Sequence, residues 1–470
     1  MKKTISGVLL ALTAVFALVA CGKKDSKKEN GTINFYCWND EFKTRLNKLY
    51  DQVDKAEGAK TTLKNGTVIK WVQTPNQSAV YQGALDIALD SDYVDMFCFE
   101  ADYATKYVKS NYVAEMAELG IDQSKQYQYT KDIVTNASGK LVGSSWQATP
   151  GIVLYNMNVA KAVWGDSVTT AQVEDKLSTK AKFDAAAADA IDAEKTMLIG
   201  PDDWYRTYGN NLVEGKMWDG TNITIDKALF QWAKDTMDYA TAGYIAGLSS
   251  DFALWGSDWG KEQGLDNTLT IFSCPWFTDF CLTGYRYKEA EKGKAVKEMS
   301  DSNLRAAAGY SSWFWGGTWL TATKSGVANE SIKNDIKDII AKMTTDKTVL
   351  LELAKTYGDF TNDKDAMTEL AGSDAGKLNY FGGQNVYSFY AAAVEKADLS
   401  KASDFDQQIS EKFQEKFHDY FRNESGEDHV SAQDAWDAFV GALADATSID
   451  KKNIKMSSKV TLNGDTITIS

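Results

Sequence analysis

Short apolar runs alternate with amphipathic segments through the first part of the chain. Ile33–Trp38 and Asp95–Glu100 are rich in branched and aromatic residues and have the length of buried strands. Phe42–Val53 repeats apolar residues at helical spacing, and Asn65-Gly66 separates two strand-like runs as a hairpin turn does. This alternation predicts a parallel or mixed sheet with helices on both faces. In such sheets, ligands bind in the loops beyond the carboxyl ends of the strands.

The stretch Leu141–Asn156, LVGSSWQATPGIVLYN, places two short apolar runs around a central segment of small and turn residues. This pattern predicts two strands joined by an irregular segment. The chain before it alternates strands and helices, whereas the chain after it is more helical. We therefore expect the stretch to cross between two lobes, with Trp146 and Gln147 at the cleft; an ordinary strand–turn–strand within one domain is the alternative. A second apolar passage, Ala306–Lys324, is broken by Gly316-Gly317 and is expected to cross back.

Composition narrows the possible functions. The 470 residues are enough for two or three domains with a substantial core. The net charge of −14 repels phosphates, so we expect no nucleic acid partner. There are 14 Trp and 22 Tyr but only two His, His418 and His429, which leaves few candidates for histidine-dependent chemistry. Cysteine and histidine spacings match no metal-site pattern, so we expect neither a metal nor a cofactor.

The N-terminus has the parts of an export signal. A lysine pair precedes the apolar stretch Val8–Ala20, which is too short to span a bilayer comfortably. The sequence LVACG at 18–22 resembles the lipobox of bacterial lipoproteins. This resemblance implies removal of the signal peptide at residues 1–20, lipidation of Cys21, and a disordered tether at residues 21–30. A plain secretory signal is the alternative. Multiple acyl chains would anchor the folded part outside the cytoplasmic membrane.

Four cysteines remain in the mature chain. Cys37 and Cys98 each lie near the end of a predicted strand, so a disulfide between them is geometrically possible if those strands are neighbours. Cys274 and Cys281 flank the start of a predicted helix, where seven residues separate Cα atoms by roughly 10 Å, too far for a bridge. Buried free thiols are the expected state, and the pairing of Cys37 with Cys98 stays open.

Several segments, in the same order along nearly the whole mature chain, resemble bacterial extracellular solute-binding proteins (family 1) of carbohydrate ABC transporters, of the lipoprotein type. Each segment alone has low specificity, whereas the ordered set is specific for the class but not for one sugar. Besides the lipobox, the segments are INFYCWNDEF (33–42), DMFCFEADYATKYV (95–108), LVGSSWQATPGIVLYN (141–156), PDDWYR (201–206), SCPWF (273–277) and WFWGGTW (313–319).

This resemblance implies an α/β, two-lobed periplasmic-binding-protein-like fold of type II, in which crossing strands join lobes built from mixed sheets and flanking helices. Lobe 1 is expected at residues 31–147 with 306–345, and lobe 2 at 148–305 with 346–470. The resemblance also implies a carbohydrate ligand in the cleft and delivery to the permease subunits of an ABC transporter. We expect a lipid-anchored monomer outside the cytoplasmic membrane.

Carried over residue by residue, the resemblance implies ligand-binding positions in loops of both lobes and in the two crossings. The sugar chemistry fits independently, because tryptophan offers a flat apolar platform for the C–H faces of a sugar. Carboxylates, amides and arginine can satisfy its paired hydroxyls with charge-assisted hydrogen bonds. The expected positions are Trp38, Asn39, Glu41, Glu100, Asp102, Trp146, Gln147, Trp204, Tyr205, Arg206, Trp276, Trp315, Gly316 and Trp319.

Each of these positions also has a structural interpretation. A tryptophan is more often a packing residue than a binding platform, and we expect about a third of the 14 in or near the cleft. Two other classes of protein remain as alternatives. One is an exported glycoside-active enzyme using cleft carboxylates such as Glu41, Glu100 and Asp102. The other is a structural surface lipoprotein without a deep cleft. The large number of candidate aromatic residues favours an oligosaccharide over a monosaccharide as the ligand.

Overall fold

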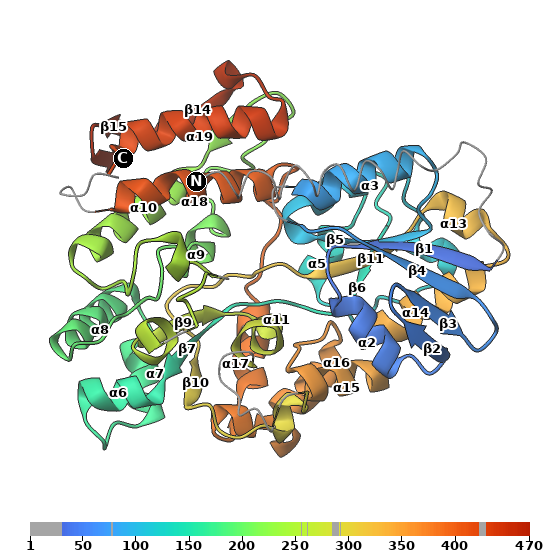
Figure 1. Ribbon diagram of the computed structural model, residues 1–470, viewed down its shortest axis with the longest axis horizontal. Coiled ribbons are helices and arrows are strands. Elements are labelled where there is room, and N and C mark those ends of the chain that lie inside the picture. Colours follow the sequence, from blue (N-terminus) through green and yellow to red (C-terminus); the bar gives the residue numbers. More distant parts are fainter. Residues whose placement is uncertain are drawn as a thin grey trace.

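The computed structural model describes residues 31–470 except 77–78, 255, 261, 284–290, 292 and 423–428. The predicted signal peptide, tether and lipidated Cys21 lie outside the described residues. Figure 1 shows two lobes side by side, with the N-terminal strands in one and the elements that follow Asn156 mostly in the other. Within the described part, no helix is both long enough and apolar enough to cross a bilayer.

Lobe 1 is built on a seven-stranded sheet in the order β2-β3-β4-β1-β5-β11-β6. The central strand β1 runs parallel to β4 and β5, and β11 is antiparallel to both β5 and β6. Because β11 comes from far along the chain, the chain must return to this lobe. The strands are β1 Thr32–Cys37, β2 Val53–Glu57, β3 Lys60–Leu63, β4 Val68–Gln73, β5 Met96–Glu100, β6 Ser144–Ser145 and β11 Thr318–Ala322.

Helices cover both faces of this sheet. Phe35 and Ile339 share one buried cluster on the α14 side, and Phe97 and Leu85 share another on the α3 side. The predicted helix face extended to Val53, which is wrong because that residue begins β2. The helices of this lobe are α2 Glu41–Leu49, α3 Val80–Asp90, α4 Ala104–Val108, α5 Gln128–Asp132, α13 Lys324–Ala328 and α14 Lys333–Thr345, with the short η2 Ala101–Tyr103 and η3 Met116–Leu119.

Lobe 2 contains a three-stranded antiparallel sheet in the order β10-β7-β9. The strands are β7 Ile152–Asn156, β9 Thr270–Ser273 and β10 Leu304–Ala307, and β8 Ile223–Ile225 pairs in parallel with β14 Ile454–Met456. Among the described residues, parallel pairing beside this sheet consists of the two single bridges Thr196–Thr268 and Leu198–Ile245. The predicted hairpin around Asn463-Gly464 is confirmed as β15 Val460–Asn463 and β16 Thr466–Ile469.

Most helices after β7 surround this sheet, and α18 and α19 lie together at the top of the lobe in Figure 1. The helices of this lobe are α6 Met157–Trp164, α7 Thr170–Lys176, α8 Lys180–Asp192, α9 Arg206–Gly209, α10 Lys227–Thr241, α11 Pro275–Phe277 continuing into η6 Thr278–Leu282, α16 Lys364–Ala371, α17 Val386–Val394, α18 Asp406–Phe421 and α19 Ala432–Thr447. A small pair, β12 Lys377–Leu378 and β13 Gln384–Asn385, links α16 to α17. Helix α15 Lys347–Tyr357 differs, because it packs against α2 of lobe 1.

Three segments connect the lobes: the one between β6 and β7, the one between β10 and β11, and the one between α15 and α16. They lie side by side, since Gln147 bridges to Thr361 and Pro150 bridges to Phe314. The predicted crossings around Leu141–Asn156 and Ala306–Lys324 are confirmed. The lobe limits given above also imply a third crossing after residue 345, whereas the third segment observed here follows α15. Strand β10 pairs inside lobe 2, so the return to lobe 1 begins after Ala307. The lobe limits given above stay a prediction.

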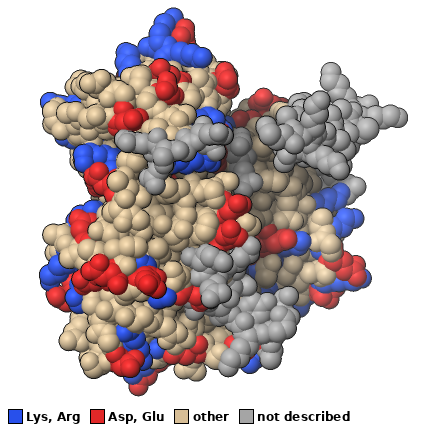
Figure 2. Space-filling view, turned by 60° about the vertical axis from the view of Figure 1, so that its left-hand side comes forward, with Lys and Arg blue, Asp and Glu red and all other residues tan. Residues whose placement is uncertain are grey.

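The four described cysteines, Cys37, Cys98, Cys274 and Cys281, are free and buried. Although β1 and β5 are neighbours, Cys37 and Cys98 are not bonded to each other. Burial raises the pKa of the Cys37 thiol to about 12, which keeps it protonated and unreactive. On the face shown in Figure 2, acidic and basic side chains are interspersed over the surface.

Candidate functional site

A cavity of about 390 Å³ lies where the lobes and the crossing segments meet. Its lobe 1 wall consists of the loops that follow β1, β4 and β5, at the carboxyl ends of parallel strands. The crossings form its floor, and α9, α11, η6 and α18 form the opposite wall. Its lining residues are Trp38, Asn39, Glu41, Asn76, Glu100, Asp102, Gln147, Arg206, Trp276, Phe280, Trp315, Gly316, Gly317, Thr318, Gln407, Ser410, Glu411 and Gln414.

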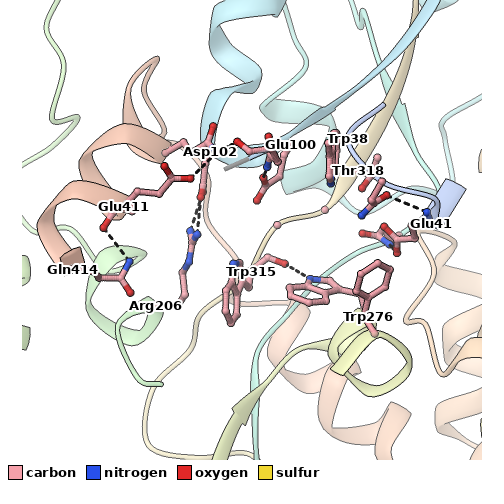
Figure 3. Close-up of a pocket in the computed structure, with 18 residues that line it drawn as sticks. Trp38, Glu41, Glu100, Asp102, Arg206, Trp276, Trp315, Thr318, Glu411 and Gln414 are labelled. Carbon is pink, nitrogen blue, oxygen red and sulfur yellow. Dashed lines mark hydrogen bonds and ion pairs between the residues drawn. The ribbon is translucent and has the colours of Figure 1, made fainter. Parts of the chain in front are cut away.

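Three tryptophans form aromatic walls. The ring nitrogen of Trp276 donates a hydrogen bond to the carbonyl oxygen of Trp315 at 2.9 Å, and the two rings meet edge to face at 5.3 Å. Trp38 packs edge-on against Tyr81 and Tyr103. These contacts hold the rings before any ligand arrives, so they lose little freedom on binding. Figure 3 shows Trp276 and Trp315 close together and Trp38 across from them.

A glycine turn brings the return crossing close to both walls. Gly316 has a φ of +66° and Gly317 a φ of +100°, conformations that favour glycine. A Cβ atom on Gly316 would lie 3.4 Å from Glu100 Oε1 and 3.5 Å from Trp276 Nε1. The backbone therefore passes between a carboxyl group of lobe 1 and an aromatic residue of lobe 2. A Cβ there would make only ordinary contacts, so the positive φ is what favours glycine at this position.

An ion pair joins the two lobes at one end of the cavity. Arg206, the first residue of α9, donates two hydrogen bonds to the carboxylate oxygens of Asp102, at 2.9 and 2.6 Å. Asp102 lies in η2, directly after β5. The guanidinium carbon of Arg206 also lies 5.4 Å from the centre of the Trp315 ring. Two parallel hydrogen bonds and a cation–π contact fix the position of this arginine.

Glu100 lies next to this pair without forming an ion pair among the described residues. Asn76 Nδ2 donates a hydrogen bond to Glu100 Oε2 at 2.9 Å. Burial and the nearby charge of Asp102 raise the pKa of Glu100 to about 8, although Arg206 opposes this rise. Figure 3 shows the Glu100 carboxylate above the middle of the cavity. It is an available acceptor for a ligand hydroxyl.

At the other end, Glu41 belongs to a buried charge network. Gln147 Nε2 donates to Glu41 Oε1 at 3.1 Å, and an Arg45 nitrogen lies 3.3 Å from the same oxygen. Arg45 itself is 1% exposed and forms two hydrogen bonds to Asp359, at 2.9 and 3.2 Å. Burial raises the pKa of Glu41 to about 7, and the positive charge of Arg45 opposes this rise. Arg45 and Asp359 thus support a cavity residue from behind.

Helix α18 contributes a polar stripe that the sequence analysis missed. Gln407, Ser410, Glu411 and Gln414 recur at helical spacing and lie on one face. Gln407 Nε2 donates to the carbonyl oxygen of Asn76 at 2.9 Å, so the helix also contacts lobe 1. The spacing was visible in the sequence, but nothing in it indicated that this helix faces the cleft. The other missed lining residues are Asn76 and Phe280, whereas Gly317 and Thr318 lie between the predicted positions Trp315 and Trp319.

Ten of the fourteen predicted positions line the cavity: Trp38, Asn39, Glu41, Glu100, Asp102, Gln147, Arg206, Trp276, Trp315 and Gly316. Four do not, and here the expectation is corrected. Trp146 packs against Phe42, with ring centres 5.0 Å apart, inside the lobe 1 core. Tyr205 is buried and lines a smaller neighbouring cavity.

The other two are fixed by hydrogen bonds inside the core. The ring nitrogen of Trp204 donates to Thr236 Oγ1 at 2.9 Å, and that of Trp319 donates to the carbonyl oxygen of Thr130 at 2.9 Å. Trp204 is fully buried and Trp319 is 1% exposed. A buried indole needs an acceptor for its N–H, and both rings find it away from the cleft.

The described residues contain no cluster of three or more His, Cys, Asp or Glu that could hold a metal ion. His418, in α18, pairs through Nε2 with Asp202 at 2.9 Å and does not line the cavity. The chemistry of the cavity therefore rests on carboxylates, amides, one guanidinium group and aromatic faces. Such a set binds through hydrogen bonds and stacking.

No sequence-family model and no curated protein sequence matches this chain. Solved structures do match its fold. An extracellular solute-binding protein of family 1 aligns with a TM-score of 0.63 and 15% identity, covering 88% of this chain and 99% of that one. An ABC-transporter-associated binding protein from B. animalis subsp. lactis, in complex with β-1,6-galactobiose, gives 0.61 and 15%, covering 92% and 100%.

A third match is an ABC substrate-binding protein from Listeria monocytogenes in complex with cycloalternan. It gives a TM-score of 0.58 and 12% identity, covering 89% of this chain and 98% of that one. The predicted two-lobed α/β fold of type II is confirmed, and the chain has the fold of extracellular solute-binding proteins of family 1.

Proposed function

We propose that this protein is a substrate-binding lipoprotein that captures a carbohydrate between its lobes and delivers it to the permease subunits of an ABC transporter. One observation carries the proposal: an interlobe cavity of about 390 Å³ combines three tryptophans with carboxylates, amides and an arginine. Its volume lies within the usual range for small-molecule sites. The similarly folded proteins that were solved with galactobiose and cycloalternan support the carbohydrate class.

Different cavity residues are suited to bind different parts of a sugar. Trp38, Trp276 and Trp315 offer apolar faces to the C–H faces of sugar rings. The carboxyl of Glu100 and the amide of Gln414 can each donate hydrogen bonds to hydroxyl groups and accept them. Arg206, fixed by Asp102, donates to a ring or hydroxyl oxygen. Binding would bury these groups between the lobes, and the closed form would then be presented to the permease.

The remaining parts of the proposal come from the sequence. The lipobox supports lipidation at Cys21 and a position outside the cytoplasmic membrane. We expect a monomer, and an oligosaccharide as ligand. We also propose binding without catalysis, because the structures that share this fold are described as binding proteins. An enzyme using Glu41 and Glu100 is the rival, and it predicts release of hydrolysis products.

The test is ligand binding by the chain that begins after Cys21. Thermal shift against mono- and oligosaccharides should give saturable stabilisation with one sugar class. A ligand at 100 times its Kd stabilises the folded state by about 2.7 kcal/mol. Product analysis after long incubation should show the sugar intact. No stabilisation by any saccharide would contradict the proposal, and hydrolysis by the wild type would favour the enzyme.

A further inference from the structure

The Asp102–Arg206 ion pair separates the main cavity from a second cavity. The second one has a volume of about 30 Å³ and lies behind the pair, toward α9 and the loop before α18. Asp102, Arg206 and Ser410 line both cavities. These three residues are therefore a wall that two compartments share. Figure 3 shows Asp102 and Arg206 at one end of the main cavity, with Trp276 and Glu41 toward the other end.

The Asp102–Arg206 pair in this wall is more buried and has more contacts than an ordinary surface ion pair. The side chains of Arg206 and Asp102 are 14% and 9% exposed, and two hydrogen bonds join them. Trp315 lies against the guanidinium group. Tyr205 donates to Ser410 Oγ at 3.3 Å, which holds the third member. Breaking a buried pair leaves an uncompensated charge, so the wall does not open easily to admit a longer ligand.

The second cavity has lining residues that could bind a sugar, but it is too small to hold one. Tyr205, Asn210, Phe314 and Asp398 line it, so it presents aromatic and hydrogen-bonding groups. Its volume of about 30 Å³ has room for only a few water molecules, since one water needs about 10–15 Å³, and this is far less than a sugar ring requires. The direction that ends at Asp102 and Arg206 is therefore closed to further sugar units.

We propose that the Asp102–Arg206 pair is a length determinant, which closes one end of the saccharide site and excludes chains that extend past Arg206. This inference rests on the proposed function. It makes the protein selective for saccharides whose terminal unit lies against the ion pair. Removing both side chains together joins the two cavities without leaving an unpaired charge, and longer saccharides then gain access.

The test compares affinities along homologous series. Isothermal titration calorimetry would use malto- and cello-oligosaccharides from the disaccharide to the hexasaccharide, together with any class found by thermal shift. The wild type should show a step, at which one additional unit lowers the affinity at least tenfold. In Asp102→Ala/Arg206→Ala, the step should disappear or move to a longer saccharide. The quantity compared is the ratio of affinities across the step, which a uniform loss of contacts does not change.

The control removes a similar pair away from the cavity. Arg305 on β10 donates two hydrogen bonds to Asp301, both at 2.8 Å. Asp301→Ala/Arg305→Ala should keep the wild-type step. If the alanine pair at 102 and 206 does not fold, Asp102→Ser/Arg206→Ser shortens the wall while keeping polar groups and is judged by the same ratio.

Two outcomes overturn the inference while leaving the proposed function intact. In one, the wild type binds all lengths of its sugar without a step. In the other, the step stays at the same length in the folded double variant. No saturable binding of any saccharide by the wild type would overturn the proposed function, and this inference with it.

Discussion

The tryptophans of the cavity wall and those of the core differ in where they lie along the secondary structure. Trp38, Trp276 and Trp315 lie at the end of a strand, at the start of a helix and in a crossing, and each is half-buried. Trp204 and Trp319 are buried and donate their N–H groups inside the protein. A loop position leaves one ring face open, whereas a position inside the packed layers covers both.

Because of this difference, we expect the two groups of tryptophans to affect different properties of the protein. The buried tryptophans of the core should contribute mainly to folding stability, and the tryptophans of the cavity wall mainly to ligand binding. The same division applies to charge, because Arg45 and Asp359 are buried in the interior while Arg206 and Asp102 line the cavity. The following changes test the division, from the largest expected effect to the smallest.

Trp204→Ala should lower the free energy of unfolding by about 3–5 kcal/mol, because it removes a fully buried ring and leaves Thr236 without its partner. Denaturant titration followed by circular dichroism measures the change. Sugar affinity, measured well below the melting temperature, should stay within about twofold of the wild type. A large loss of affinity in the folded variant would mean that Trp204 acts on the cavity after all.

Arg45→Met should cost about 3–5 kcal/mol of stability, because it leaves the carboxylate of Asp359 buried without its partner. Arg45→Met/Asp359→Leu should recover part of that loss, since the charge of Asp359 is gone while Glu41 still lacks its cationic neighbour. Chemical denaturation of the two variants provides the comparison. Equal stability of the single and double variants would show that the pair is not the source of the effect.

Glu100→Gln should stabilise the protein more as the pH rises. The folded chain holds the Glu100 proton up to a pKa of about 8, whereas the unfolded chain releases it near 4.5. The unfolded state is therefore increasingly favoured between these pH values in the wild type, and the variant avoids this loss. The difference in melting temperature should be near zero at pH 4 and reach its maximum by pH 8.

At its maximum, the difference for Glu100→Gln corresponds to about 3–5 kcal/mol. The matched control is Glu118→Gln, which makes the same substitution at an exposed position away from the cavity. A difference in melting temperature for Glu100→Gln that is constant from pH 4 to pH 8 would contradict a raised pKa at Glu100.

Trp276→Ala should lower sugar affinity about tenfold, equivalent to about 1.4 kcal/mol, while changing the stability by less than about 1 kcal/mol. The substitution removes ring contacts with Trp315, Phe280 and Phe277. Trp164→Ala, which removes a half-buried tryptophan away from the cavity, is the control and should keep full affinity. Unchanged affinity in Trp276→Ala would remove this ring from the site.

Local patterns in the sequence located much of the lobe 1 wall. Short apolar runs fixed β1 and β5, and ligands bind beyond the carboxyl ends of parallel strands, so Trp38, Glu41, Glu100 and Asp102 could be identified as wall residues. The neighbours Trp146 and Gln147 show the limit of this reasoning. Successive side chains of an extended segment point in opposite directions, so one enters the core and the other lines the cavity.

The sequence by itself determined the strands, the turns, the crossings and the chemical types available to a sugar site. Only the tertiary structure decided that α18 faces the cleft and that Asp102 meets Arg206 across it. Periodicity places Gln407 and Gln414 on one helix face but does not say what that face meets. The reason is physical: local patterns depend on neighbours along the chain, whereas a wall between lobes depends on how distant segments pack.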